Sequence, residues 1–261
     1  MDSFETLAQA VLKMGNLANA RQKDIVIDYK EDGSLVTSID REISFHLSSL
    51  IKELFAEANV ISEEELFTFD NEAPLTFVID PIDGTDVYSQ GLPSWCISVG
   101  ILNQKREPIG AMINAPRWGL NWHEGLFLRQ DPSKNLLLNG EPFKARNWSI
   151  ASRQITMSSY ASRYLPLERY HGKIRCYGSN ILHMISPLIH PLIQCAVSTP
   201  CYVWDLCGAH ALLVLQGLKV VYGDAKPFTY DDELLIRRKR FKGVIYSGEA
   251  SAVDEIRTLF A

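Results

Sequence analysis

The most informative stretch of this chain is Phe77-Val78-Ile79-Asp80-Pro81-Ile82-Asp83-Gly84-Thr85. An apolar run that meets a proline and then a glycine predicts a strand that ends at Asp80. Asp80 and Asp83 stand three residues apart at the end of this strand, so both carboxylates can point into one pocket. The backbone carbonyl of Ile82 lies between them and can add a further oxygen ligand.

The turn after this strand can bind anions as well as cations. Gly84 lets the backbone approach a ligand closely, so the N–H groups of Gly84 and Thr85 can hold an anion. Mg²⁺ prefers oxygen ligands, with carboxylates completed by water and substrate phosphate, so the stretch predicts a magnesium site. The simpler alternative is a tight turn in which the two aspartates only cap backbone N–H groups.

Three other segments place carboxylates at the end of a strand or the start of a helix. Residues 60–65 are an apolar strand that ends in Glu63, Glu64 and Glu65. Thr37 and Asp40 stand at a predicted helix start, and Asp205 follows Trp204 at another. Taken singly, the glutamates are typical of a solvated face, and the other residues are typical of helix caps.

Composition restricts the possible classes of function. The chain has 261 residues, 46% of them apolar and 22% charged, which is the balance of a globular protein with a sizeable core. Its formal charge of −5 gives no basic footprint for nucleic acid or an anionic membrane, and we expect neither as a partner.

Early Asp2 and Glu5 are not typical of a signal peptide and predict a capping box on an amphipathic helix over residues 1–19. Five cysteines without a C-x-x-C pair predict a reduced, cytoplasmic protein.

The remaining elements predict a mixed α/β fold. Strand-like runs cover residues 76–80, 95–102, 109–115, 155–158, 219–222 and 243–247, and helical patterns cover residues 43–54, 205–216 and those from 251 onward. Residues 176–204 lack Asp, Glu, Lys and Arg but contain three prolines, so we expect a buried helix and a turn there rather than a membrane span. Several strands follow one another without a helix between them, so mixed sheets covered by helices are expected. We expect one domain over residues 1–261, with sub-sheets at approximately 1–150 and 151–261.

A basic run, Arg-Arg-Lys-Arg at residues 237–240, lies beside a predicted strand. We interpret it as an edge strand protected by charge. A short nucleic-acid or nuclear-targeting patch and a contact with a second phosphate of the substrate are the alternatives.

Together and in this order, the four carboxylate segments resemble the inositol monophosphatase family of Mg²⁺-dependent, lithium-sensitive phosphomonoesterases. Residues 80–85 match the family signature D-P-[IL]-D-G-T without a mismatch, and Trp204-Asp205 resembles its W-D-x-A-A-G box. Glu63-Glu64 is similar to its paired glutamates, and residues 36–40 are similar to its V-T-x-x-D element. Gly178-Ser179 resembles a G-[ST] turn of the family, and the resemblance spans roughly residues 30–223.

The resemblance implies two or three Mg²⁺ ions and a ligand set for each. Glu63, Asp80 and the carbonyl of Ile82 would hold a first ion. Asp80, Asp83 and Asp205 would hold a second ion, and Glu63 would also face a looser third site. The family fold is a layered α/β/α/β/α sandwich, commonly a homodimer, and we expect both here.

The resemblance also implies the catalytic and substrate-binding residues. Thr85, hydrogen-bonded toward Asp40, and Glu64 would orient or deprotonate a metal-bound water, which would attack a small phosphate monoester. The residues expected to contact the substrate are Gly84, Thr85, Gly178 and Ser179. No histidine nucleophile is needed, so His183 and His210 are interpreted as packing residues.

Departures from the family pattern leave the substrate open. Cys207-Gly208-Ala209 replaces Ala-Ala-Gly, although all of these residues are small enough for close helix packing. Ser198 stands at about the place of the acidic residue by which inositol-specific members bind the ring hydroxyls. Residues 30–37 and His210-Ala211 resemble the branch that hydrolyses 3′-phosphoadenosine 5′-phosphate or histidinol phosphate. An inositol phosphate, a nucleoside bisphosphate and a related sugar phosphate all stay open, and so does a catalytically silent relative that binds a phosphorylated ligand or a partner protein.

Overall fold

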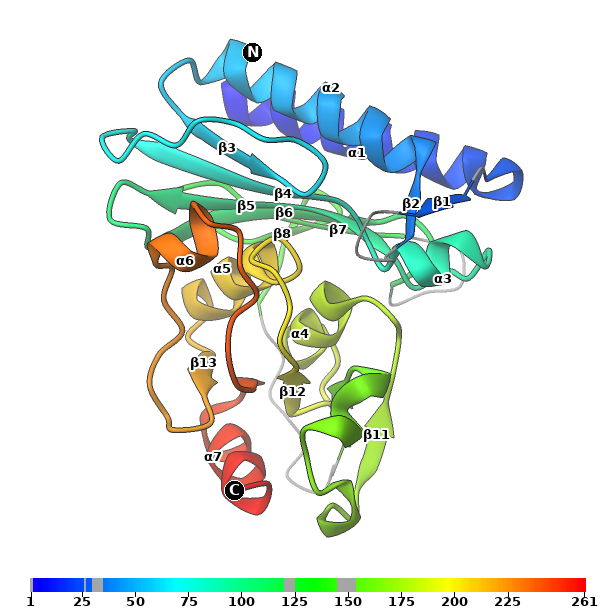
Figure 1. Ribbon diagram of the computed structural model, residues 1–261, viewed down its shortest axis with the longest axis vertical. Helices are drawn as coiled ribbons and strands as arrows, with labels where there is room; N and C mark the ends of the chain where they lie inside the picture. The colour runs from blue at the N-terminus through cyan, green and yellow to red at the C-terminus, as the bar shows by residue number, and fades with distance from the viewer. Residues whose placement is uncertain (1, 26, 30–34, 120–124, 145–153) are drawn as a thin grey trace.

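The computed structural model describes residues 2–25, 27–29, 35–119, 125–144 and 154–261, and its elements stack in five layers (Figure 1). Helices α1 (Ser3–Arg21) and α2 (Ser38–Leu54) cover the outer face of a seven-stranded sheet. Helices α4 (Asn180–Ile189) and α5 (Cys207–Leu215) lie between this sheet and a five-stranded one, and α7 (Ala250–Leu259) covers the far side. The predicted α/β/α/β/α sandwich is therefore confirmed.

The seven-stranded sheet carries the first part of the site. In sheet order its strands are β3 (Asn59–Ser62), β4 (Leu75–Asp83), β5 (Cys96–Asn103), β6 (Pro108–Ala115), β7 (Leu126–Gln130), β8 (Leu137–Leu138) and β9 (Glu141–Pro142). Strand β3 runs parallel to β4, and the other neighbours are antiparallel. Because helices cover both faces, eight of the nine residues of β4 are buried, which explains its nearly continuous apolar sequence.

The five-stranded sheet is built from the second part of the chain. Its strands, in sheet order, are β11 (Lys173–Arg175), β10 (Gln154–Met157), β12 (Cys195–Ser198), β14 (Ile245–Gly248) and β13 (Lys219–Tyr222). Strand β10 is parallel to both of its neighbours, and β14 is antiparallel to both of its own. The shorter elements are β1 (Ile27–Tyr29), β2 (Leu35–Thr37), α3 (Thr85–Ser89), α6 (Asp232–Leu235) and the 3₁₀ turns Gln22–Asp24, Ser159–Arg163 and Leu167–Arg169. That the chain folds as one domain stays a prediction.

Close packing of α5 against the seven-stranded sheet brings Asp205 to the end of β4. A Cβ atom at Gly208 would overlap Oγ of Ser98 on β5, so glycine allows this approach without a shift of Ser98. All nine residues from Cys207 to Leu215 are apolar, glycine or histidine, and the first seven are buried. The small residues that replace the family's Ala-Ala-Gly therefore keep the close packing that the sequence predicts.

Three local expectations are wrong. Asp2 caps α1 by accepting a hydrogen bond from the N–H of Phe4, but Glu5 pairs with Arg129 instead of completing a capping box. Residues 176–204 contain the expected buried helix and turn, but residues 195–198 then form a strand that we did not expect. Residues 237–240 form no strand, because Arg238 has a left-handed backbone with φ of +51° that breaks an extended run.

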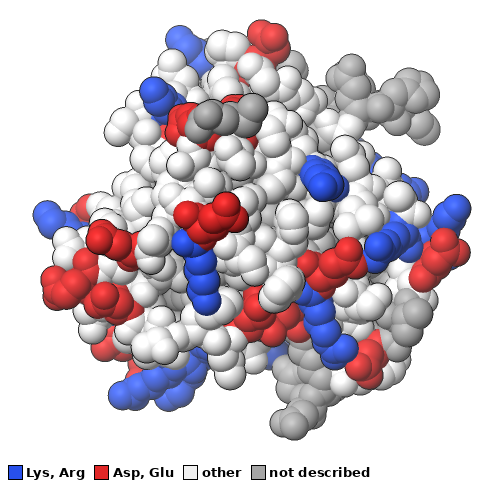
Figure 2. Space-filling model, turned by 90° about the horizontal axis from the view of Figure 1, so that it is seen from above, with Lys and Arg blue, Asp and Glu red and all other residues white. Residues whose placement is uncertain are grey.

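The surface of the described residues agrees with the charge balance. On the face shown in Figure 2, Lys and Arg side chains alternate with Asp and Glu side chains and form no continuous basic patch among the described residues. In that described part of the chain, no helix is both long and apolar enough to cross a membrane.

Candidate active site

Three aspartates from two distant segments meet between the layers. Asp80 and Asp83 lie at the end of β4, and Asp205 lies just before α5. One carboxylate oxygen of each lies within 4.8 Å of the others. The pairing of β4 with β5 shifts register between Asp80 and Asp83, at the proline of the signature, and this bulge lets both aspartates face one cluster.

Asp80 is the least compensated carboxylate of the three. Its side chain is 1% exposed, and neither carboxylate oxygen has a hydrogen-bond partner. Burial, together with the nearby carboxylates of Glu63 and Asp83, raises the pKa of Asp80 well above its ordinary value. A buried carboxylate without a donor is costly unless a cation compensates it.

Asp83 is held by the N-terminus of α4. Its carboxylate accepts hydrogen bonds from the hydroxyl of Ser179, from the N–H of Asn180 over 3.3 Å and from the N–H of Ile181 over 2.6 Å. Burial still raises the pKa of Asp83 to about 7, although these donors lower it. Ser179 is fully buried and caps α4. Its hydroxyl contacts Asp83 and does not reach the cavity.

Asp205 is fixed by two backbone contacts. Its Oδ2 accepts a hydrogen bond from the N–H of Tyr202 over 2.7 Å, and its carbonyl accepts one from Nδ2 of Asn180 over 2.9 Å. The N-cap of α5 is Leu206, so the alternative reading of Asp205 as a helix cap is wrong. Burial and the charge of Asp83 raise the pKa of Asp205 to about 7.

Glu63 and Glu64 lie in the turn that follows β3. The N–H of Glu63 donates to the carbonyl of Ile79 over 3.3 Å, which holds the turn against β4. Residues 63–65 are half-buried rather than a fully solvated face. The Glu63 carboxylate contributes to the raised pKa of Asp80, and the Glu64 carboxylate contributes to that of Asp40.

Thr85 and Asp40 form a second polar pair beside the aspartates. Asp40 is 1% exposed and closes a capping box with Thr37 at the start of α2. The hydroxyl of Thr85 lies 3.3 Å from Oδ1 of Asp40 and 3.0 Å from the carbonyl of Ile82. Burial raises the pKa of Asp40 to about 6, despite the hydrogen bonds from Thr37.

A cavity of about 470 Å³ opens onto these groups. All five predicted metal-binding residues line it: Glu63, Asp80, Ile82, Asp83 and Asp205. Gly84, Thr85 and Gly178 also line it, whereas Asp40, Glu64 and Ser179 do not. Gly84 has φ of +94°, a left-handed conformation that glycine adopts without strain and that starts α3 at Thr85.

The comparisons with known proteins agree with this geometry. The model of the inositol monophosphatase family matches residues 2–256. The chain belongs to the inositol monophosphatase family. Its members are phosphoric monoester hydrolases, so the predicted family and enzyme class are confirmed.

Two curated relatives show how far the family likeness extends in sequence. The chain is 27% identical to the "Fructose-1,6-bisphosphatase/inositol-1-monophosphatase" of Thermotoga maritima, over 70% of each chain. It is 28% identical to the "Inositol-1-monophosphatase" of Synechocystis over 49% of this chain, which is 42% of that protein. The alignments thus cover between about two fifths and seven tenths of these relatives.

Two solved structures of inositol monophosphatases (IMPases) share the fold. An IMPase of Thermotoga maritima superposes with a TM-score of 0.81 at 21% identity, over 99% of this chain and 96% of that one. An "IMPase/NADP phosphatase complexed with Mg2+ and phosphate" superposes with a TM-score of 0.79 at 14% identity, over 98% and 93%. At these identities the likeness shows the fold of this inositol monophosphatase family member.

The two histidines singled out in the sequence are buried and make packing contacts, as predicted, although His183 also lines the cavity. The backbone N–H of Tyr177 donates to Nε2 of His183 over 2.7 Å. Nδ1 of His210 lies 2.9 Å from the hydroxyl of Tyr230. Burial lowers the pKa of both histidines to about 3, so both are neutral at physiological pH.

Sequence reasoning missed Asn180 and Tyr202 among the residues that line the same cavity in this family member, and it considered Arg240 only as part of the basic run 237–240. Asn180 links two ligand segments, since its N–H reaches Asp83 and its side chain reaches the carbonyl of Asp205. The ring of Tyr202 and the guanidinium of Arg240, 4.8 Å from its centroid, line another part of the wall. Asn180 directly follows the Gly-Ser turn, which was the only local signal for it.

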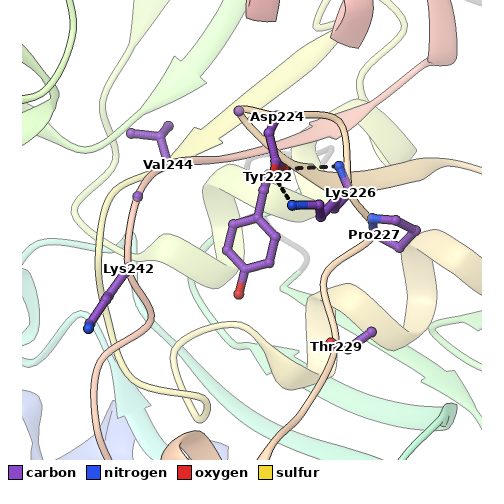
Figure 3. Close-up of a pocket in the computed structure, with 9 residues that line it drawn as sticks. Tyr222, Asp224, Lys226, Pro227, Thr229, Lys242 and Val244 are labelled. Atoms are coloured by element: carbon purple, nitrogen blue, oxygen red, sulfur yellow. Dashed lines mark hydrogen bonds and ion pairs between the residues drawn. The ribbon is translucent and has the colours of Figure 1, made fainter.

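A second cavity of about 500 Å³ lacks this chemistry (Figure 3). It lies between β13 and the segment before β14, and its lining includes Tyr222, Lys226 and Lys242. Asp224 is its one lining carboxylate, and it forms an ion pair with Lys226 over 2.7 Å. With its single carboxylate already paired, this cavity offers no cluster of oxygen ligands.

Proposed function

We propose that this protein is a Mg²⁺-dependent phosphatase that hydrolyses a small phosphate monoester with water as the nucleophile. The observation that carries the proposal is the pair of buried, unpartnered oxygens of Asp80 inside a cluster of carboxylates. Five acidic side chains line this cavity and repel one another, and divalent cations compensate that repulsion.

The residues present fit such ions. All donors are hard oxygens, as Mg²⁺ requires, and the cluster includes no cysteine or histidine ligand that would favour zinc. Glu63, Asp80 and the Ile82 carbonyl would hold one ion, and Asp80, Asp83 and Asp205 a second. A third ion near Glu63 is part of the proposal. The solved relative with Mg²⁺ and phosphate supports the choice of metal.

Divalent ions bound here would neutralise the phosphate oxygens, lower the pKa of a coordinated water and stabilise the leaving alkoxide. The chain itself would orient that water. Thr85 donates its single hydroxyl proton inward, to Asp40 or to the Ile82 carbonyl, so its lone pairs are left to accept a hydrogen bond from water in the cavity. Asp40, with a pKa of about 6, and Glu64 are the proposed proton acceptors.

Phosphate binding is proposed for the loop that starts α3. The backbone N–H groups of Gly84 and Thr85 would grip the phosphate, and Gly178 would contact the substrate from the opposite segment. Gly84, Thr85 and Gly178 all line the cavity, which supports these roles. Ser179 would act mainly through Asp83, which it contacts.

The cavity suits a small phosphorylated metabolite that carries further polar or anionic groups. Its volume of about 470 Å³ is in the usual range for small-molecule sites. Arg240 is an exposed cation on its wall, which favours substrates with a second anionic group. Two curated relatives are named for the hydrolysis of inositol 1-phosphate and fructose 1,6-bisphosphate, so these compounds come first in a panel of candidate substrates.

Phosphate release from such a panel, with and without Mg²⁺, tests the proposal. We expect Mg²⁺-dependent turnover of inositol 1-phosphate, fructose 1,6-bisphosphate, 3′-phosphoadenosine 5′-phosphate or histidinol phosphate. Calorimetric Mg²⁺ binding without turnover of any of them would instead support the catalytically silent alternative. The cytoplasmic location and the homodimer stay predictions, and sedimentation analysis of the purified protein tests the homodimer.

A further inference from the structure

The basic run at residues 237–240 contacts the segment before Asp205 through a stack of side chains. The guanidinium of Arg240 lies 4.8 Å from the ring centroid of Tyr202. The rings of Tyr202 and Trp204 are 4.6 Å apart and nearly parallel, with an angle of 13°. The guanidinium of Arg238 lies 4.8 Å from the ring of Trp204. We call this arrangement the cation–aromatic stack.

Arg238 also holds the turn that carries Glu63. Its Nη2 donates to the carbonyls of Ser62 over 2.6 Å and of Glu63 over 2.9 Å. Its Nη1 donates to the carbonyl of Glu65 over 2.5 Å. One half-buried guanidinium therefore satisfies three carbonyls of the turn 62–65 while it packs on Trp204.

The backbone conformation of Arg238 places its side chain between the turn 62–65 and Trp204, and we call these contacts the Arg238 bridge. Arg238 adopts φ of +51°, which is uncommon for a residue with a side chain. The next residues are anchored on both sides, since the N–H of Lys239 donates to the carbonyl of Glu233 over 2.9 Å and that of Phe241 to the carbonyl of Cys201 over 3.1 Å. Three charge-assisted hydrogen bonds offset the cost of this backbone conformation. Such local strain is typical of residues with a specific role.

We propose that Arg238 is a positioning residue that docks the Glu63 turn onto the Trp204-Asp205 segment and thereby prearranges the Mg²⁺ ligands of both. The inference rests on the proposed function, because it concerns the same metal site. The planar fork of arginine is required, since lysine offers a point charge that cannot match several carbonyls in one plane while stacking on an indole ring. Without the bridge, Mg²⁺ binding would have to order the Glu63 turn, and its affinity would fall.

Calorimetric titration of the metal-free full-length protein with MgCl₂ tests the proposal. We expect Arg238→Ala to weaken Mg²⁺ binding by roughly 10- to 100-fold, the range found when groups that orient metal ligands are removed. Arg238→Lys should recover only part of the affinity. At saturating Mg²⁺, the KM for the phosphate ester should stay within about twofold of the wild-type value, because Arg238 does not line the cavity.

Arg237→Ala is the matched control, because Arg237 is an exposed neighbour that pairs with Glu233. It should bind Mg²⁺ as the wild type does. Wild-type affinity in both Arg238 variants would overturn the positioning role and leave the proposed function intact. Absence of Mg²⁺ binding in the wild type would overturn both. If Arg238→Ala does not fold, Arg238→Lys decides the question alone.

Discussion

The hydroxyl of Thr85 at the start of α3 lies 3.3 Å from Oδ1 of Asp40 in the first turn of α2. The contact joins the proposed phosphate-binding loop to a buried carboxylate whose other oxygen already accepts a hydrogen bond from Thr37. Neither Thr85 nor Asp40 belongs to the cluster of Asp80, Asp83 and Asp205. The proposed proton-handling and metal-binding roles therefore fall on separate side chains, and mutation can separate them.

Thr85→Val should lower kcat by about 10²- to 10⁴-fold, the usual contribution of a positioned proton-transfer group. Mg²⁺ affinity should change little, because the variant keeps every carboxylate of the cluster. Steady-state kinetics and calorimetry on the same preparation give both values. Thr85→Ser is the control, since it keeps the hydroxyl, and near-wild-type activity of Thr85→Val would remove Thr85 from the mechanism.

Asp80→Asn should lower the activity without lowering the stability of the metal-free protein. The amide removes a central Mg²⁺ ligand, so kcat should fall by about 10³-fold or more, equivalent to roughly 4 kcal/mol of transition-state stabilisation. In the metal-free protein the same change removes a buried, unpaired carboxylate, so the thermal midpoint should rise or stay level.

The control for this variant is Asp24→Asn, at an exposed carboxylate, which should change neither quantity. Wild-type turnover in Asp80→Asn would refute the assignment of the metal site. A lower thermal midpoint in the metal-free variant would show that Asp80 is compensated by contacts within the protein.

The sequence predicts the parts of the site that are local. The spacing of Asp80 and Asp83 predicts paired carboxylates at a strand end, and the structure brings them together. The predicted end of the strand at Asp80 is wrong, because β4 continues through Pro81 to Asp83 with a bulge. The order of the family motifs predicts that Asp205 joins them. Strands and helices with clear periodicity are likewise found within about three residues of their predicted bounds, except that α2 begins at Ser38, five residues before the periodic run 43–54.

The rest depends on contacts between layers, which no local pattern encodes. Arg238 belongs to a basic run that is typical of a solvated edge, and its contacts with Ser62 and Glu65 follow only from how the segment before β14 crosses the site. Asn180 has the same kind of dual contact. Strand β12 is only four residues long, and periodicity cannot distinguish so short an apolar run from a turn or helix.

The stability of the metal-free protein should fall as the pH rises from about 4 to about 7. In the folded chain, burial raises the pKa of Asp83 and Asp205 to about 7 and that of Asp40 to about 6, above the ordinary aspartate value of 3.8. These three carboxyl groups therefore bind more protons in the folded state than in the unfolded chain in this interval, and their contribution to the free energy of unfolding decreases with pH. His183 and His210, whose pKa burial lowers to about 3, oppose this trend in part.

Urea unfolding of the stripped protein at pH 5.5 and pH 8 measures this dependence. The lower pH should give the higher free energy of unfolding, and Asp83→Asn should flatten the difference. Saturating Mg²⁺ at pH 8 should restore stability, because it binds the ionised carboxylates of the folded state. A wild-type stability that rises from pH 5.5 to pH 8, with no flattening in Asp83→Asn, would contradict the raised pKa values.

Arg240→Met should change substrate preference rather than metal binding. Arg240 is exposed, lines the cavity and stacks on Tyr202, so its cation can meet a second anionic group on the substrate. Loss of one charge-assisted hydrogen bond should lower kcat/KM for fructose 1,6-bisphosphate or 3′-phosphoadenosine 5′-phosphate by about tenfold. For a substrate with a single phosphate, such as inositol 1-phosphate, the loss should stay below about twofold.

Lys239→Met is the matched control, because Lys239 pairs with Glu233 and does not line the cavity. Equal losses for both kinds of substrate would mean that Arg240 supports the wall of the cavity through Tyr202 and does not select a second anionic group.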